Sequence, residues 1–95
     1  MNESAFVEAA KALGKQLAAE PTAERQRLET ALQRIIVGQP RPHELDTYLN
    51  FLHYNQQHYQ ANPALAQAAG LSIEEAAWWQ VVTVLLNSDR ALNKD

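Results

Sequence analysis

The chain has 95 residues, of which 46% are hydrophobic and 20% are charged, and its formal net charge at pH 7 is −3. A chain of this length has room for one core, so we expect residues 1–95 to form a single domain. The eight basic residues are scattered, which argues against nucleic-acid binding, and the lack of cysteine excludes disulfides, thiol catalysis and covalent haem attachment within this chain.

The first 38 residues predict two amphipathic helices separated by a turn at Pro21. Ser4 and Thr22 are the candidate N-caps of the two helices, and Gly38 fits the left-handed position just past the second. Apolar residues recur at spacings of three and four, as they do on one face of a helix. They are Phe6, Ala9, Ala10, Leu13 and Leu17 in the first helix, and Leu28, Leu32, Ile35 and Ile36 in the second.

A third helix is predicted from Pro42, because a proline costs no hydrogen bond in the first turn. Its apolar side consists of Leu45, Leu49, Leu52 and Tyr59, widened by Tyr48, Phe51 and Tyr54. Such a wide apolar arc predicts contacts with two or three neighbouring helices. The opposite stripe is polar and consists of Asp46, Asn50, His53 and Gln57.

The last third of the chain predicts a short helix followed by a long one. Asn62 and Pro63 begin the short, alanine-rich helix, and Gly70 ends it. Ser72 and Glu75 have the spacing of a capping box, which opens the long helix. The apolar stripe of that helix is Trp78, Val81, Val82 and Leu85. Since no segment has the period of a strand, we expect an all-α compact bundle of four main helices and one short helix.

The sequence predicts no catalytic residue, metal ligand or cofactor site. His53 and His58 are five residues apart, which separates them by about 140° on a helix, unlike the i, i+4 pair of a zinc helix. Glu74 and Glu75 are explained by their place in the first turn of a helix. Ser88 and Asp89 lack the glycine-rich nucleophile elbow of a hydrolase. We therefore expect a chain that is not an enzyme.

Trp78 and Trp79 are the one dense aromatic feature of the sequence. Trp78 shares the stripe of Val81 and Leu85, so it is expected in the core. Trp79 is rotated by about 100° and is expected at the core edge, where Trp79 and Leu86 form a candidate docking surface. The alternative is a ligand site, for a glycan, on a candidate polar face of Asp46, Asn50, His53 and Gln57.

The order of these signals resembles the C-terminal domain of a planctomycete family known as PSD-one, a domain of unknown function often joined to cytochrome c modules. The resemblance rests on residues 2–7 leading into the alanine-leucine helix at 9–13, an arginine-started helix at 25–37, the turn at 38–45 and the tryptophan helix at 78–92. Gln39, Arg41 and the pair Arg90 and Ala91 depart from the family pattern. A second large family of bacterial proteins of unknown function has a similar helical ending.

The resemblance implies an extracytoplasmic, multidomain parent protein of which residues 1–95 are an excised C-terminal segment. Haem c would then be bound elsewhere in the parent, and no family catalytic residue maps onto this segment. The partners expected are other domains of the parent, a separate protein, or a second copy of this domain as a weak homodimer. No stretch reaches the roughly 20 apolar residues of a membrane span. We expect a non-catalytic docking module, with the ligand-binding module as the alternative.

Overall fold

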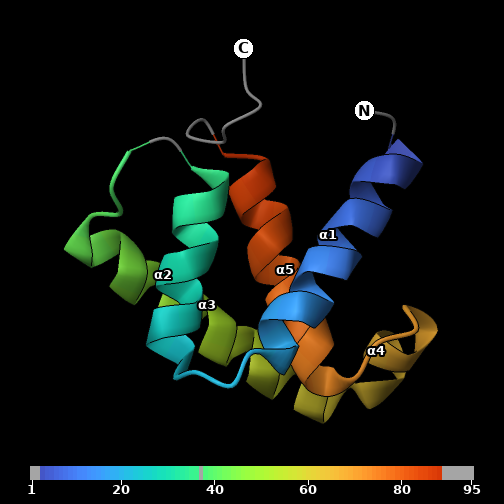
Figure 1. The fold of residues 1–95 in the computed structure, drawn as a ribbon. Coiled ribbons are helices and arrows are strands. Elements are labelled where there is room, and N and C mark those ends of the chain that lie inside the picture. The colour runs from blue at the N-terminus through green and yellow to red at the C-terminus, as the bar shows by residue number, and fades with distance from the viewer. Residues whose placement is uncertain (1–2, 37, 89–95) are drawn as a thin grey trace.

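The structure, a computed structural model, describes residues 3–36 and 38–88, and these residues form five helices and no strand (Figure 1). The helices are α1 (Glu3–Ala19), α2 (Glu24–Ile35), α3 (Pro42–Ala61), α4 (Pro63–Ala68) and α5 (Ile73–Leu86). The predicted all-α bundle of four main helices and one short helix is therefore confirmed. Asp89 and the end of the segment 78–92 lie outside the described residues.

The starts of α3 and α5 follow the predicted chemistry. Ser72 caps α5: its hydroxyl oxygen accepts from the Glu75 N–H at 3.1 Å, and the Glu75 carboxylate accepts from the Ser72 N–H at 2.9 Å. Pro42 occupies the first turn of α3, where the Glu44 carboxylate accepts from the Arg41 N–H at 2.9 Å. These contacts satisfy backbone donors that the helix itself leaves free.

Helix boundaries in the first half of the chain differ from prediction by one or two residues. The first helix begins at Glu3, so Ser4 lies inside it rather than capping it. Ala23 is the cap position of α2, and the Thr22 carbonyl instead accepts a hydrogen bond from Arg27 Nε at 2.7 Å. Gly38 is left-handed with φ of 88°, as predicted, but Ile36 is already extended, so Gly38 lies in the link to α3 and not directly at the helix end.

The last helix, α5, is the central element of the fold. It contacts each of the other four helices, and Figure 1 shows it between α1 and α2 with α3 crossing below. The main partner of α1 is α5, although the two helices lie near opposite ends of the chain. The third helix contacts α2, α4 and α5, which confirms the expectation drawn from its wide apolar arc.

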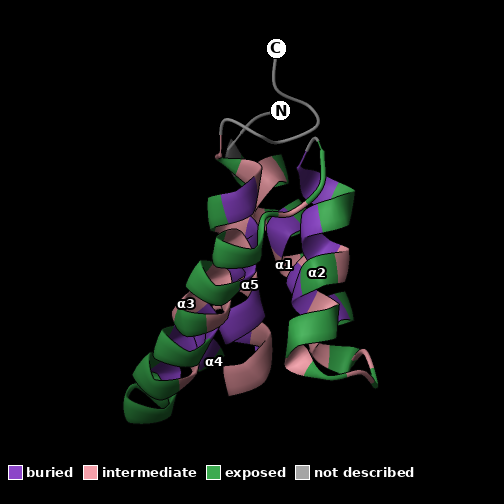
Figure 2. Ribbon diagram, turned by 90° about the vertical axis from the view of Figure 1, so that its left-hand side faces the viewer, coloured by how far each residue is buried: buried purple, intermediate pink, exposed green. Residues whose placement is uncertain are grey.

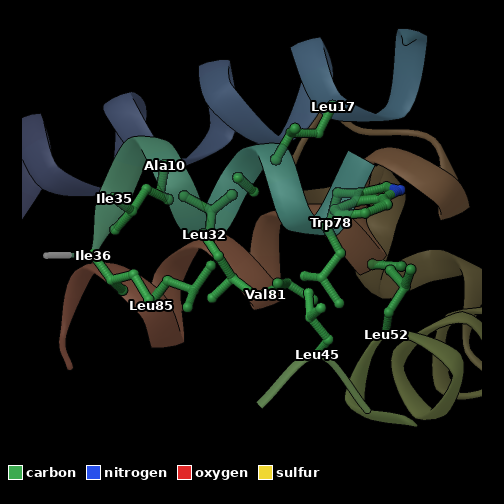
Figure 3. Packing of buried hydrophobic residues seen from close by; sticks show 14 residues of the cluster. Ala10, Leu17, Leu32, Ile35, Ile36, Leu45, Leu52, Trp78, Val81 and Leu85 are labelled. Atoms are coloured by element: carbon green, nitrogen blue, oxygen red, sulfur yellow. The ribbon is translucent and has the colours of Figure 1, made fainter. Parts of the chain in front are cut away.

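The main apolar cluster of the core lies between α1, α2, α3 and α5, and Trp78 is its largest fully buried side chain (Figure 3). The predicted core position of Trp78 is confirmed. Leu17 of α1, Leu32 of α2 and Leu52 of α3 are also fully buried in this cluster. A smaller cluster of Tyr59, Ala66, Leu71 and Ala76 attaches α4 to α3 and α5.

The crossing of α1 and α5 depends on a glycine. A Cβ atom placed on Gly14 would lie 2.8 Å from the backbone nitrogen of Trp79 and 2.9 Å from its Cα. Real Cβ atoms do not approach a backbone that closely, so the two helices can meet at this separation only because residue 14 has no side chain. The backbone of Trp79 is thus packed directly against α1.

Candidate functional site

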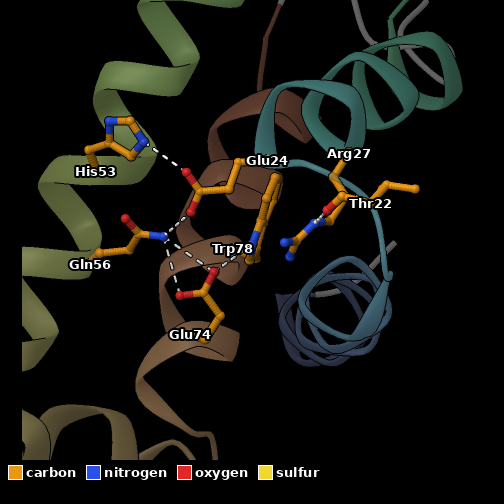
Figure 4. Close-up of polar contacts among 7 residues, drawn as sticks. All are labelled: Thr22, Glu24, Arg27, His53, Gln56, Glu74 and Trp78. Atoms are coloured by element: carbon orange, nitrogen blue, oxygen red, sulfur yellow. Dashed lines mark hydrogen bonds and ion pairs between the residues drawn. The ribbon is translucent and has the colours of Figure 1, made fainter.

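A polar junction joins α2, α3 and α5 (Figure 4). The Gln56 amide donates to Glu24 Oε2 at 2.6 Å and to both carboxylate oxygens of Glu74 at 3.2 Å. The indole N–H of Trp78 donates to Glu74 Oε1 at 3.1 Å, and His53 Nε2 lies 2.9 Å from Glu24 Oε1. The junction consists of Glu24, His53, Gln56, Glu74 and Trp78. In it Gln56 of α3 binds two carboxylates, one from the first turn of α2 and one from the first turn of α5.

The electrostatics of the junction favour ionised Glu24. Partial burial acts to raise the pKa of Glu24, but hydrogen bonds from Gln56 and His53 and the charges of His53 and Arg27 outweigh it, so the pKa is lowered from its ordinary value of 4.5. The Arg27 guanidinium also lies over the Trp78 ring, 5.7 Å from its centroid. Each of the five side chains in the junction has at least one polar contact with another of them, so these contacts tie α2, α3 and α5 together.

Metal chemistry gains no support from the histidines. Among the described residues, no group of three or more His, Cys, Asp or Glu side chains lies close enough together to hold a metal ion. His53 pairs with Glu24, whereas His58 stacks on Tyr54 and meets Tyr59 edge-on. His43 lies at the edge of an apolar groove between α3 and α5.

The candidate polar face lies exposed on α3, and it faces α2 rather than a hollow. Asp46 accepts from Arg25 at 2.9 Å, and His53 pairs with Glu24, so two of the four residues are engaged by α2. Asn50 and Gln57 are exposed, and none of the four residues lines the groove between α3 and α5 or the small hollow beside α1 described below.

The candidate docking residues Trp79 and Leu86 are both half-buried on α5. The Trp79 ring packs between the two apolar clusters, and the Lys11 ammonium of α1 lies 5.4 Å from its centroid. Beside Lys11 is a small hollow of about 220 Å³ that α1 shares with the turn at Gly70. Leu86 packs against the main core cluster. The structure therefore places Trp79 at the junction of α1 with α5.

The larger hollow is an apolar groove between α3 and the C-terminal half of α5. Its volume is about 430 Å³, and it is lined by His43, Glu44, Thr47, Tyr48, Phe51 and Val84. Figure 2 shows the exposed outer side of α3. The sequence pattern had placed Tyr48 and Phe51 on the wide apolar arc of this helix, but the groove itself was missed because its other wall, Val84, comes from α5.

Three large apolar side chains of the described residues are exposed. Val84 of α5 is 40% exposed and lines the groove, whereas Tyr54 of α3, at 63%, and Leu65 of α4, at 51%, lie outside its lining. Isolated exposed apolar residues are ordinary, so the feature that distinguishes this region is the apolar groove itself.

Comparison with known proteins found no match to this chain among family models, curated proteins or solved structures. Within the described residues no helix has both the length and the apolar character needed to cross a membrane.

Proposed function

We propose that this chain is a non-catalytic helical module that docks onto another protein segment through the groove between α3 and α5. The observation that carries the proposal is the groove itself, a mainly apolar hollow whose lining includes Tyr48 and Phe51 of α3 and Val84 of α5. A groove between two packed helices accepts a third helix that presents apolar side chains at spacings of three and four. The occupant proposed is such an amphipathic helix.

The context proposed for the module comes from the resemblance to the planctomycete family. On that basis the chain would be the C-terminal domain of a larger extracytoplasmic protein, and haem c, where present, would be bound by another part of that protein. Docking would then join this domain to the rest of the parent or to a partner. The polar junction supports a non-catalytic role, because its carboxylates and histidine are engaged in contacts between helices.

The alternative function is glycan binding, and one observation favours it. The rings of Tyr54 and His58 are almost parallel, at 9°, with centroids 6.2 Å apart, and Tyr54 is largely exposed. Flat aromatic surfaces of this kind can stack on the apolar face of a sugar. The polar side chains of Asn50 and Gln57 lie on the same helix and could supply hydrogen bonds.

An NMR titration of the whole chain tests both functions with defined probes. One probe is a soluble model helix with leucine at positions i, i+3, i+4 and i+7, and the other is a panel of neutral oligosaccharides. Docking predicts that the helix shifts the amide signals of Tyr48, Phe51 and Val84, and that Val84→Lys abolishes these shifts. A control variant, Gln57→Lys, adds the same charge outside the groove and should leave the shifts unchanged.

The oligosaccharides distinguish the alternative. Shifts centred on Tyr54 and His58 with a sugar, and none with the model helix, would replace docking by glycan binding. A chain that responds to neither probe would contradict both functions.

A further inference from the structure

One side of α3 carries a stripe of residues that runs along the groove and beyond it. The stripe consists of Glu44, Tyr48, Phe51, Tyr54 and His58, and we call it the α3 stripe. Glu44, Tyr48 and Phe51 are half-buried and line the groove, whereas Tyr54 and His58 are exposed. The positions recur every three or four residues, so they form one face of the helix.

The spacings of the α3 stripe are the same in both directions. Its successive spacings are four, three, three and four residues, with Phe51 at the centre. Tyrosines stand at equal distances on either side of Phe51, and beyond them stand one acidic residue, Glu44, and one histidine, His58. A surface with this order is complementary to a copy of itself that runs in the opposite direction.

We propose that two copies of this chain associate through their α3 helices, which pair antiparallel about a two-fold axis at Phe51. This inference rests on the proposed docking function and specifies the occupant of the groove as α3 of a second copy. In such a pair Phe51 meets Phe51 of the second copy, and Tyr48 meets Tyr54 of the second copy. Each Glu44 meets His58 of the other copy, so the pairing has two such polar contacts. A two-fold interface uses the same patch on both subunits, as this arrangement does.

The chemistry of the paired residues suits this register. Aromatic rings bury large areas with few rotamers, so they contribute strongly to interfaces. The Glu44 carboxylate already accepts from the Arg41 N–H, but a carboxylate has further acceptor positions. An imidazole N–H can donate to it whether or not the ring is charged. The reverse, parallel pairing would place Glu44 beside Glu44 and His58 beside His58, which is unfavourable.

The strength of the association follows from the size of the contact. One pair of helices with one flanking residue, Val84, offers less area than the roughly 1,200–2,000 Å² of a stable interface. We therefore expect a weak dimer that dissociates on dilution. Sedimentation equilibrium of the whole chain from about 10 μM to about 1 mM should show the mass rising from monomer to dimer.

Substitutions on the stripe should remove the dimer. Tyr54→Glu adds a charge at a largely exposed position, so it should leave the fold intact and the circular dichroism unchanged. Phe51→Glu places two carboxylates together at the axis, but it also removes a half-buried ring that packs against the core, so a lower free energy of unfolding is expected and circular dichroism checks that the variant is folded. Both variants should remain monomeric at the highest concentration. Gln57→Glu adds the same charge outside the stripe and should dimerise like the parent chain.

A charge exchange tests the register itself. His58→Glu should weaken association by about tenfold, because it places two carboxylates against each other at both ends of the interface. Glu44→Lys should also weaken association, because it removes the carboxylate that accepts from the His58 N–H at both ends. The double variant Glu44→Lys/His58→Glu should recover most of the loss, since lysine then faces glutamate in the second copy. The Glu44→Lys change also removes a helix cap, but that effect is common to the single and double variants and cancels between them.

The outcomes separate this inference from the proposed function. A monomer at about 1 mM would overturn the dimer, and binding of the model helix to the groove would then leave docking intact. A dimer that survives both Phe51→Glu and Tyr54→Glu, or a double variant no better than the singles, would overturn the α3 pairing. A chain that neither dimerises nor binds the helix would overturn both.

Discussion

The two sides of α5 are held to the rest of the domain by different physical means. On one side, α1 packs at the separation set by Gly14, and the contact depends on the fit of apolar surfaces. On the other, the polar junction ties the start of α5 to α2 and α3 through Gln56 and two carboxylates. The packing of α1 on α5 is sensitive to added side-chain volume, and the polar junction is sensitive to added or removed charge. Substitutions that change only volume or only charge should separate the contributions of the two contacts to stability.

The largest loss of stability is expected for Trp78→Ala, because Trp78 takes part in both the apolar core and the polar junction. Its ring is fully buried in the core, and its indole N–H donates to Glu74 in the polar junction. Removing it should lower the free energy of unfolding by about 3–5 kcal/mol in urea denaturation. Trp78→Phe keeps most of the buried volume and should lose clearly less. Equal losses in the two variants would mean that the polar contact of Trp78, and not its volume, dominates.

Gly14→Ala tests the α1 side alone. At an ordinary position inside a helix this change is stabilising, by roughly 0.5–1 kcal/mol. At Gly14 the new methyl group meets the Trp79 backbone, so we expect a net loss of about 1–3 kcal/mol in thermal or urea melts. The control is Ala12→Gly at an exposed position of the same helix, which should cost only the propensity difference. A stabilised Gly14→Ala variant would show that α1 can move away from α5 at little cost.

Gln56→Glu tests the polar junction alone, since glutamate has nearly the same shape as glutamine. It removes the amide donor and adds a third carboxylate beside Glu24 and Glu74, so we expect a loss of about 1–2 kcal/mol at pH 7. The loss should shrink in acid, because repulsion raises the pKa of the new carboxyl group and it protonates first. Gln57→Glu, on the exposed face, should change stability little at either pH. Denaturation at pH 7 and pH 4 measures both.

The smallest effect is the pH dependence contributed by Glu24. Its pKa is lowered in the folded chain, so the stability it adds is present above its unfolded value near 4.5 and is lost as the pH falls through the folded value. Because the side chain is about one-third exposed, we expect less than about 1 kcal/mol. Glu24→Gln should flatten this part of the stability curve. An unchanged slope between pH 5 and pH 3 would assign the dependence to other carboxyl groups.

Local features of the fold could be predicted from the sequence, and contacts between distant segments could not. The capping box at Ser72 and the first-turn proline at Pro42 depend on residues within one helical turn, so their pattern is sufficient. The N-caps predicted at Ser4 and Thr22 were misplaced because serine and threonine also occur within or before a first turn without capping it. Gly14 was not distinguished at all, since its importance depends on which helix crosses it.

In the candidate site, too, the local features could be predicted from the sequence and the contacts between distant segments could not. Glu74 was explained by its position in a first helical turn, and nothing local indicated that Gln56 brings it together with Glu24. The wide apolar arc of α3 was correctly read as evidence for several neighbours, but the pattern could not tell which part of the arc stays uncovered. That part, at Tyr48 and Phe51, becomes a groove only because Val84 of α5 forms its other wall.

The pairing of the first helix with the last has a consequence for synthesis of the chain. When α1 leaves the ribosome, α5, its main partner, has not yet been made. The face of α1 that carries Gly14 then has no helix to pack against. Contacts between segments far apart in the chain also form slowly, because a long loop must close first. During translation the apolar faces of α1 and α2 therefore stay exposed until α5 emerges, and the core can form only then. A nascent chain stalled before Ile73 should be cleaved readily by protease, and one extended far enough for Leu86 to leave the ribosome should resist.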